Sequence, residues 1–210
     1  MSKLRGSGRM IAMAWTAALL LAGSVAHAQS DGPVVEAVWK PQRINFVYRG
    51  YSTLYSCSGL QAKLEKILTT VGARDDSVEL RAYSCDDQLS TARFEIALAS
   101  PVEATPENVQ ELTTYDERDE LAARVRGERL PSAEDLQRFP AVWKTISFAR
   151  SRNLKLEPGD CELVLQLRRQ ILQRMSVQIV SDRVQCSEFG NISRPRLTVS
   201  ALVPAQQLSD

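Results

Sequence analysis

An internal repeat constrains the fold of this chain more than any other feature of its sequence. Ala37-Val38-Trp39-Lys40 recurs as Ala141-Val142-Trp143-Lys144, 104 residues later, and the same offset carries Cys57 onto Cys161. Further along the chain the two segments no longer align at this fixed offset, but their apolar residues and cysteines still follow one another in the same order. Self-similarity at a fixed spacing is the usual mark of repeated units. The sequence therefore predicts a duplicated unit, in preference to two unrelated segments of similar composition.

Each unit is predicted to run strand, helix, strand, strand. In the first unit, residues 31–101, an apolar stripe along Cys57–Val71 indicates a helix with Ser56 as its N-cap. In the second unit, residues 141–205, the helix is Glu162–Met175 and the N-cap is Asp160. Alternating apolar and polar residues indicate the strands. These are Val34–Tyr48, with a break at Pro41, and Val78–Ser84, Ala92–Ala99, Ala141–Ala149, Val177–Gln185 and Leu197–Val203.

This pattern predicts an α+β fold made of tandem β-α-β-β units. Alternating strands need cover on one face only, so the two helices are expected on one face of a mixed or antiparallel sheet. The sequence leaves open whether the units share one six-stranded sheet or form two three-stranded sheets.

The segment between the units, residues 102–140, differs in composition. Its first part, residues 103–120, holds seven acidic side chains and one basic. We interpret the segment as a polar connector with one or two helices, including a short capped one at Ser132-Ala133-Glu134-Asp135. The acidic run Asp116–Glu120 is interpreted as a solvated face, because it lacks the spaced ligands and glycine of a calcium loop. Residues 206–210 form a tail.

The four cysteines are predicted to form two disulfides, one inside each unit. The first helix rises by roughly 22 Å, and the strand that follows returns by roughly 26 Å. This path brings Cys85 beside Cys57, and the same argument brings Cys186 beside Cys161. Each bond would stabilise its unit by about 3 kcal/mol. A thiol-redox site or a zinc site is disfavoured, because closely spaced cysteine pairs are absent from the sequence.

The N-terminal residues are predicted to be a secretory signal peptide. A basic start is followed by an uncharged Ala- and Leu-rich stretch and by Ala26-His27-Ala28, a small-x-small cleavage pattern. We expect cleavage near Ala28 and a periplasmic or secreted protein, with no transmembrane segment. The remaining 182 residues would carry 23 basic and 25 acidic side chains. Nucleic-acid binding is not expected of a chain without a basic excess.

Several kinds of chemistry are disfavoured by composition. His27 is the only histidine and would leave with the signal peptide, which argues against histidine-dependent catalysis and histidine-based metal sites. No phosphate-binding or dinucleotide-binding glycine motif is present. We therefore expect no cofactor, no metal site and no catalytic residues, although carboxylate chemistry stays formally open.

The segment before the first helix is the most distinctive local feature. Tyr48, Tyr51 and Tyr55 lie close together there, with Arg43 on the preceding strand and Arg49 directly after it. Tyrosine and arginine are enriched at protein interfaces, so these five residues are candidates for partner binding. The alternative is that the tyrosines pack over the loop beside the disulfide. A second basic group, Arg168-Arg169 with Arg174, would contact an anionic envelope component or stay solvated.

The function that the sequence favours is binding without catalysis. We expect an exported soluble protein that binds a protein partner or an envelope component. The alternatives are a carboxylate-dependent hydrolase acting on envelope material and a periplasmic thiol-redox protein. The sequence does not predict the oligomeric state.

Overall fold

The computed structural model describes residues 32–85, 90–187 and 193–206. The predicted signal peptide and residues 207–210 of the tail lie outside this part of the chain. Within it, the protein has an α+β fold, as the sequence predicts. No helix in these residues is both long enough and apolar enough to cross a membrane.

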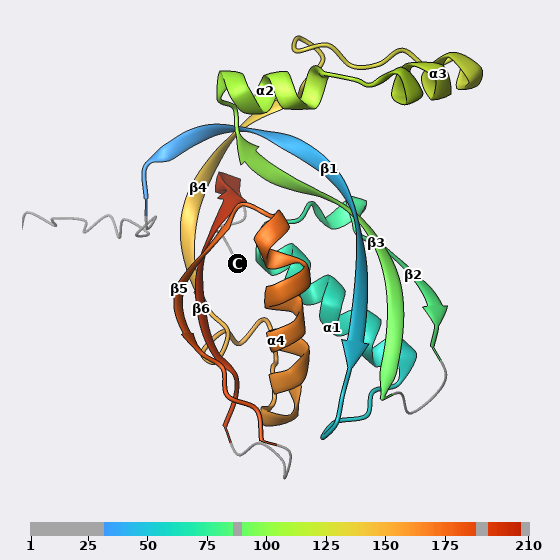
Figure 1. Cartoon of the computed structure of the whole chain (residues 1–210). Helices are drawn as coiled ribbons and strands as arrows, with labels where there is room; N and C mark the ends of the chain where they lie inside the picture. The colour runs from blue at the N-terminus through green and yellow to red at the C-terminus, as the bar shows by residue number, and fades with distance from the viewer. Residues whose placement is uncertain (1–31, 86–89, 188–192, 207–210) are drawn as a thin grey trace, which may run out of the picture.

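One six-stranded antiparallel sheet organises the described residues (Figure 1). Its order is β2-β3-β1-β4-β6-β5, so the strands of both predicted units belong to one sheet and no parallel pair occurs in it. The strands are β1 (Val34–Arg49), β2 (Glu79–Ser84), β3 (Thr91–Glu103), β4 (Arg138–Ser147), β5 (Val177–Arg183) and β6 (Arg196–Pro204).

The strand order is symmetric about the centre of the sheet. If β1, β2 and β3 are exchanged for β4, β5 and β6, the order reads the same from the opposite edge. β1 and β4 pair at the centre, where Glu36 lies opposite Pro140. These two residues are also 104 apart in sequence. The 104-residue offset therefore brings one pair of residues face to face at the centre of the sheet.

Two helices supply most of the apolar cover of the sheet. α1 (Cys57–Thr70) buries Leu60, Leu64 and Ile67, and α4 (Cys161–Gln170) buries Leu163, Val164 and Leu167. These side chains share one core cluster with alternate residues of β1, namely Ile44, Phe46 and Tyr48. Figure 1 shows the two helices beside each other within the curve of the sheet. Short 3-10 helices occur at Asp75–Ser77 (η1), Pro158–Asp160 (η2) and Leu172–Arg174 (η3).

A glycine ends α1 and brings it close to the second half of the chain. Gly72 follows the helix with φ +105°, a conformation that side chains disfavour. A Cβ at this position would lie 2.3 Å from the carbonyl oxygen of Leu202 in β6. Gly72 therefore ends the helix and also permits contact between the two halves.

The structure contains both predicted disulfides. One joins Cys57 to Cys85 and the other joins Cys161 to Cys186. In each half the bond links the first residue of the main helix to the segment after the following strand. The two bonds therefore occupy equivalent places in the two halves.

The predictions for Ser132–Asp135, for the end of α4 and for Pro41 need correction. Ser132–Asp135 is a turn closed by side-chain and backbone hydrogen bonds, not a helix. α4 ends at Gln170, before the predicted Met175, because the chain tightens into η3. β1 is continuous through Pro41, because the pairing of β1 with β3 is unbroken there and a proline nitrogen is tolerated on the side of a strand away from its partner.

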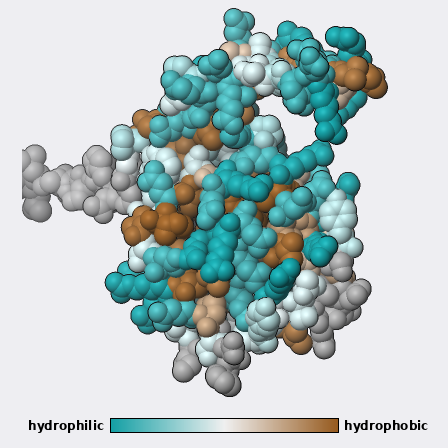
Figure 2. Space-filling model, viewed as in Figure 1, coloured by the Kyte–Doolittle hydropathy of each residue, from teal (hydrophilic) through white to brown (hydrophobic). Residues whose placement is uncertain are grey.

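The connector forms an arm beyond the end of the sheet (Figure 1). It contains α2 (Pro106–Thr113) and α3 (Glu117–Arg126). The acidic run Asp116–Glu120 lies at the start of α3, where Asp116 and Asp119 form a capping box. Figure 2 shows hydrophobic side chains exposed at the end of this arm, and Leu121 and Val125 of α3 are exposed.

Candidate functional site

The candidate site lies where β1 loses its strand partner on one side. β1 pairs with β3 from Ala37 to Arg49, but it pairs with β4 only from Val34 to Val38. Beyond Val38 the two central strands separate and α4 lies against β1. The backbone groups at the end of β1 therefore face a helix from the other half of the chain.

Two glutamines of α4 take the place of the missing strand. Gln170 accepts from the backbone nitrogen of Val47 and donates to the Val47 carbonyl, with both distances 2.9 Å. Gln166 does the same at Arg49, where the backbone nitrogen donates over 2.7 Å. A primary amide carries a donor and an acceptor, as a peptide group does. The pair at i and i+4 on one helix face thus continues the hydrogen-bonding pattern of a strand.

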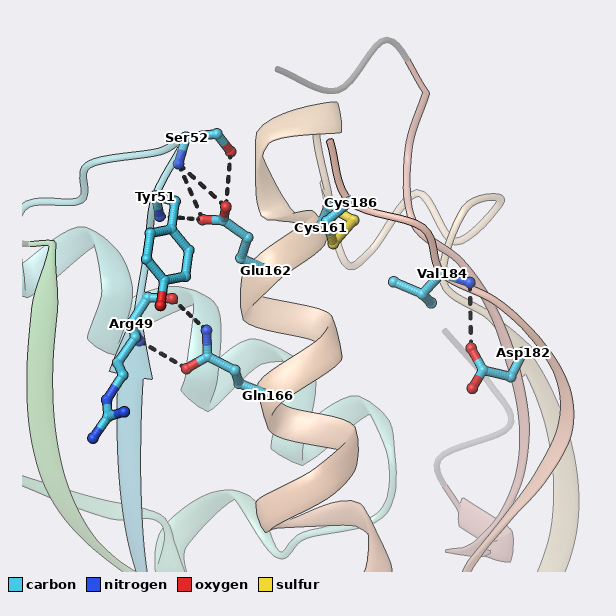
Figure 3. Close-up of a disulfide and its surroundings, with 9 residues drawn as sticks. All are labelled: Arg49, Tyr51, Ser52, Cys161, Glu162, Gln166, Asp182, Val184 and Cys186. Atoms are coloured by element: carbon cyan, nitrogen blue, oxygen red, sulfur yellow. Dashed lines mark hydrogen bonds between the residues drawn. A yellow bond between two sulfur atoms is a disulfide. The ribbon is translucent and has the colours of Figure 1, made fainter. Parts of the chain in front are cut away.

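A buried carboxylate extends this row by one turn of the helix. Glu162 accepts hydrogen bonds from the backbone nitrogens of Tyr51, over 2.8 Å, and Ser52, over 3.2 Å, and also from the Ser52 hydroxyl. Glu162 is only 7% exposed. Figure 3 shows Arg49, Tyr51 and Ser52 facing Glu162 and Gln166. The segment from Gly50 to Tyr55, which we call the tyrosine loop, is therefore fixed by its backbone.

A second buried carboxylate holds the end of the tyrosine loop. Asp160 accepts from the Tyr55 hydroxyl on one oxygen, and from Lys63 and the Glu157 nitrogen, over 2.8 and 2.7 Å, on the other. Asp160 occupies the N-cap position of α4, as predicted, but its side chain makes no capping hydrogen bond. Its carboxylate instead links α4 to the tyrosine loop and α1.

The two buried tyrosines are held in their neutral forms. Burial raises the pKa of Tyr55 above its usual range, and the hydrogen bond to Asp160 raises the pKa further. Burial also raises the pKa of Tyr48. The Tyr48 hydroxyl donates to the Thr53 carbonyl over 2.9 Å, and the two rings meet edge to face. At Gly50 a Cβ would lie 2.2 Å from the Tyr48 hydroxyl, so this close approach requires glycine.

A groove of about 550 Å³ runs between the end of β1 and α4. Tyr51, at its rim, is 83% exposed although its backbone nitrogen is bonded to Glu162. Two arginines, Arg49 and Arg169, lie on opposite sides of the groove. Its remaining lining residues are Val47, Glu162, Leu165, Gln166, Gln170, Cys186 and Ser187.

The structure separates the five predicted binding residues into two groups. Tyr48 and Tyr55 are buried in the core, at 0% and 7% exposure, and are not available for contact with a partner. Tyr51 and Arg49 are exposed and line the groove. Arg43 is also exposed and does not line it. Three further residues of the site were not predicted, namely Glu162, Gln166 and Gln170. Their spacing of i, i+4 and i+8 beside an apolar helix face is the signal in the sequence that could have indicated them.

Comparison of the chain with protein-family models, with curated proteins and with solved structures finds no match.

The carboxylates of the site are engaged by groups of the protein itself. All four carboxylate oxygens of Asp160 and Glu162 accept hydrogen bonds from groups of the protein itself. Among the described residues, no cluster of three or more potential metal ligands occurs. The groove presents an exposed phenol ring and two guanidinium groups to another molecule. The backbone of the tyrosine loop is already ordered by its hydrogen bonds to Glu162.

Proposed function

We propose that this chain is an exported protein that binds a protein partner or an envelope component through the groove and the tyrosine loop, without catalysing a reaction. Export is supported by the N-terminal sequence pattern and by the two disulfides, since disulfides persist in oxidising compartments such as the periplasm. In this proposal the chain is cleaved near Ala28 and functions in the periplasm or outside the cell.

We also propose that the scaffold arose by tandem duplication, with both helices covering one face of the sheet. The symmetric strand order and the equivalent disulfides support this, as does the meeting of Glu36 with Pro140 at the centre. The two copies then differ at the segment before their helices. The first copy has the tyrosine loop, and the second has residues 152–159 with no tyrosine.

The observation that carries the binding proposal is the contrast at Tyr51. Its backbone nitrogen is held by Glu162, whereas the residue as a whole is 83% exposed. Folding gains little from a large ring left in water. A partner gains from it, because a tyrosine on an ordered backbone supplies contact area at a low cost in conformational entropy.

The alternative functions receive less support. A hydrolase using carboxylates would need acidic groups free to act on a substrate, but Asp160 and Glu162 are engaged in holding the tyrosine loop. A thiol-redox protein would need a reactive cysteine pair, and each cysteine in the structure is in a disulfide that joins a helix to its sheet.

The proposal can be tested by comparing two exposed tyrosines. Tyr51 lines the groove, and Tyr83 lies on the edge strand β2 and is 61% exposed. A photo-crosslinking amino acid at position 51 is expected to capture a defined partner from the cell envelope, whereas the same group at position 83 should not.

Affinity measurements would then establish which residues matter. Tyr51→Ser is expected to weaken binding of the captured partner by at least about tenfold, in line with the loss of an interface tyrosine, while Tyr83→Ser binds normally. Equal binding by both variants, or no capture at position 51, would refute the proposal. Thermal unfolding of each variant verifies that the fold is intact.

A further inference from the structure

The outer face of the second half of the sheet carries an unusual pair of charges. Arg183 on the edge strand β5 lies directly opposite Arg196 on β6. Like charges in directly opposed strand positions destabilise a sheet. No ion pair within the described part of the chain involves either arginine, and both are exposed.

The first half of the chain supplies an internal comparison. On its edge strand β2, Arg81 lies directly opposite Glu95 of β3. This is the stabilising arrangement of opposite charges. The two edges thus have the same architecture, but one pairs an arginine with an acid and the other pairs it with a second arginine.

A hollow of about 530 Å³ lies beside the arginine pair. Hydroxyl groups from three adjacent strands line it, because Ser147 of β4 and Ser181 of β5 both lie opposite Thr198 of β6. Arg150, after β4, adds a third guanidinium to its rim, and no described acidic side chain lines it. Next to it, a second hollow of about 420 Å³ shares Arg183 and Arg196 and adds Arg194. The one acid there, Asp182, is paired with Arg168 of α4.

The second half of the chain as a whole also carries an excess of positive charge. Residues 141–205 hold ten basic and five acidic side chains, whereas residues 102–140 hold five basic and ten acidic. The positive potential is therefore concentrated in the half that carries the hollow. A positive potential over a concave surface raises the local concentration of anions.

We propose that this hollow is a binding site for a phosphate group. Guanidinium groups bind phosphate through paired hydrogen bonds, and the serine and threonine hydroxyls donate to the remaining oxygens. A bound phosphate removes the repulsion between Arg183 and Arg196, which gives the like-charge pair a role. The site shares no lining residue with the groove, so it does not depend on the function proposed above.

The phosphate group can belong to a soluble phosphorylated compound or to a lipid headgroup. Isothermal titration of the mature, oxidised protein with pyrophosphate and with glucose 6-phosphate tests the first source. Sedimentation with phosphatidylglycerol vesicles, against phosphatidylcholine vesicles, tests the second. Sodium chloride at matched ionic strength controls for nonspecific screening.

Matched variants locate the binding. Arg196→Gln is expected to weaken the binding of phosphate by at least about tenfold, while Arg81→Gln, in the opposite-charge pair at the other edge of the sheet, leaves it unchanged. Arg196→Glu should abolish binding and also raise the midpoint of thermal unfolding in phosphate-free buffer, because it restores an opposite-charge pair.

Binding of the soluble compounds identifies a soluble ligand, and binding of anionic vesicles alone identifies a lipid headgroup. The proposal is overturned if the wild-type protein binds none of these probes, or if Arg81→Gln and Arg196→Gln weaken binding equally.

Discussion

At the scale of single residues, Glu162 is the side chain on which the tyrosine loop depends most. Its carboxylate accepts from two backbone nitrogens and one hydroxyl in a nearly buried position. Glu162→Gln replaces one accepting oxygen with an amide donor, which would face other donors. We expect a loss of about 2–3 kcal/mol in the free energy of unfolding, measured in urea.

Glu65 provides the control for this substitution, because it is an exposed glutamate on α1. Glu65→Gln is expected to change the free energy of unfolding by less than about 0.5 kcal/mol. A similar effect of both substitutions would show that Glu162 does not hold the loop.

The buried tyrosines predict how stability depends on pH. The pKa values of Tyr48 and Tyr55 are raised in the folded protein, so the folded state retains protons that the unfolded state loses above about pH 10. Stability should therefore be constant with respect to these groups below pH 10 and fall as the pH rises above it.

The Tyr48→Phe variant tests this dependence. It removes one of the two buried tyrosines that titrate, so between pH 10 and 11 the equilibrium constant for unfolding should rise by a factor roughly fivefold smaller than in the wild-type protein. The measurement is urea unfolding at pH 8, 10 and 11. An unchanged slope in the variant would contradict the assignment of a raised pKa to Tyr48.

The roles of single residues were predictable only where they act locally. Ser56 caps α1 through Gly59, three residues away, and such short-range pairs are visible in a sequence. Asp160 was placed correctly at the start of its helix, but its partner Tyr55 precedes it by 105 residues. The sequence contains no signal for that pairing, because it depends on how the two halves pack.

At the scale of secondary structure elements, α4 serves as a substitute strand for β1. Replacing Gln166 and Gln170 with alanine leaves the backbone groups of Val47 and Arg49 without protein partners. We expect the double variant to lose about 2 kcal/mol of stability, since each glutamine makes two hydrogen bonds of modest net worth. The Val47 and Arg49 amides should also exchange hydrogen faster.

Gln173 offers a control, because it is an exposed glutamine in η3, one turn further along the chain. Gln173→Ala should leave both the stability and the exchange of these amides unchanged. Normal protection of Val47 and Arg49 in the double variant would mean that the glutamines do not support the strand.

The periodicity of apolar residues predicted which segments form strands and helices, but it did not predict the residues at which they end. The alternation in Phe94, Ile96 and Leu98 identified β3, whose real end at Glu103 lies beyond the predicted Ala99. β3 continues because it pairs with β1 as far as Ala37. Strand ends depend on the partner strand, and a single sequence does not contain that information.

At the scale of the whole molecule, the two halves should not fold independently. The first half, residues 31–137, contains β1 but lacks the helix that satisfies its end, and it lacks Asp160, the acceptor of Tyr55. The core cluster includes side chains of both halves. We expect each half alone to show no cooperative unfolding by circular dichroism, and a mixture of the two to recover it.

Separate expression of residues 31–137 and 138–206 makes this test direct. A cooperative transition in the isolated first half would show that α4 is dispensable for the folding of β1. The intact chain should unfold in a single transition, because the sheet and the core are continuous across its centre.

The pairing of β1 with α4 also affects how the chain folds while it is being synthesised. A ribosome makes Val47 long before Gln170, which is 123 residues later in the chain. At typical elongation rates this interval lasts roughly 6 to 25 seconds. During it, one edge of the growing first half has no partner. A chain built in this way stays incompletely folded until nearly all of it has been made, which is the state that a chaperone recognises.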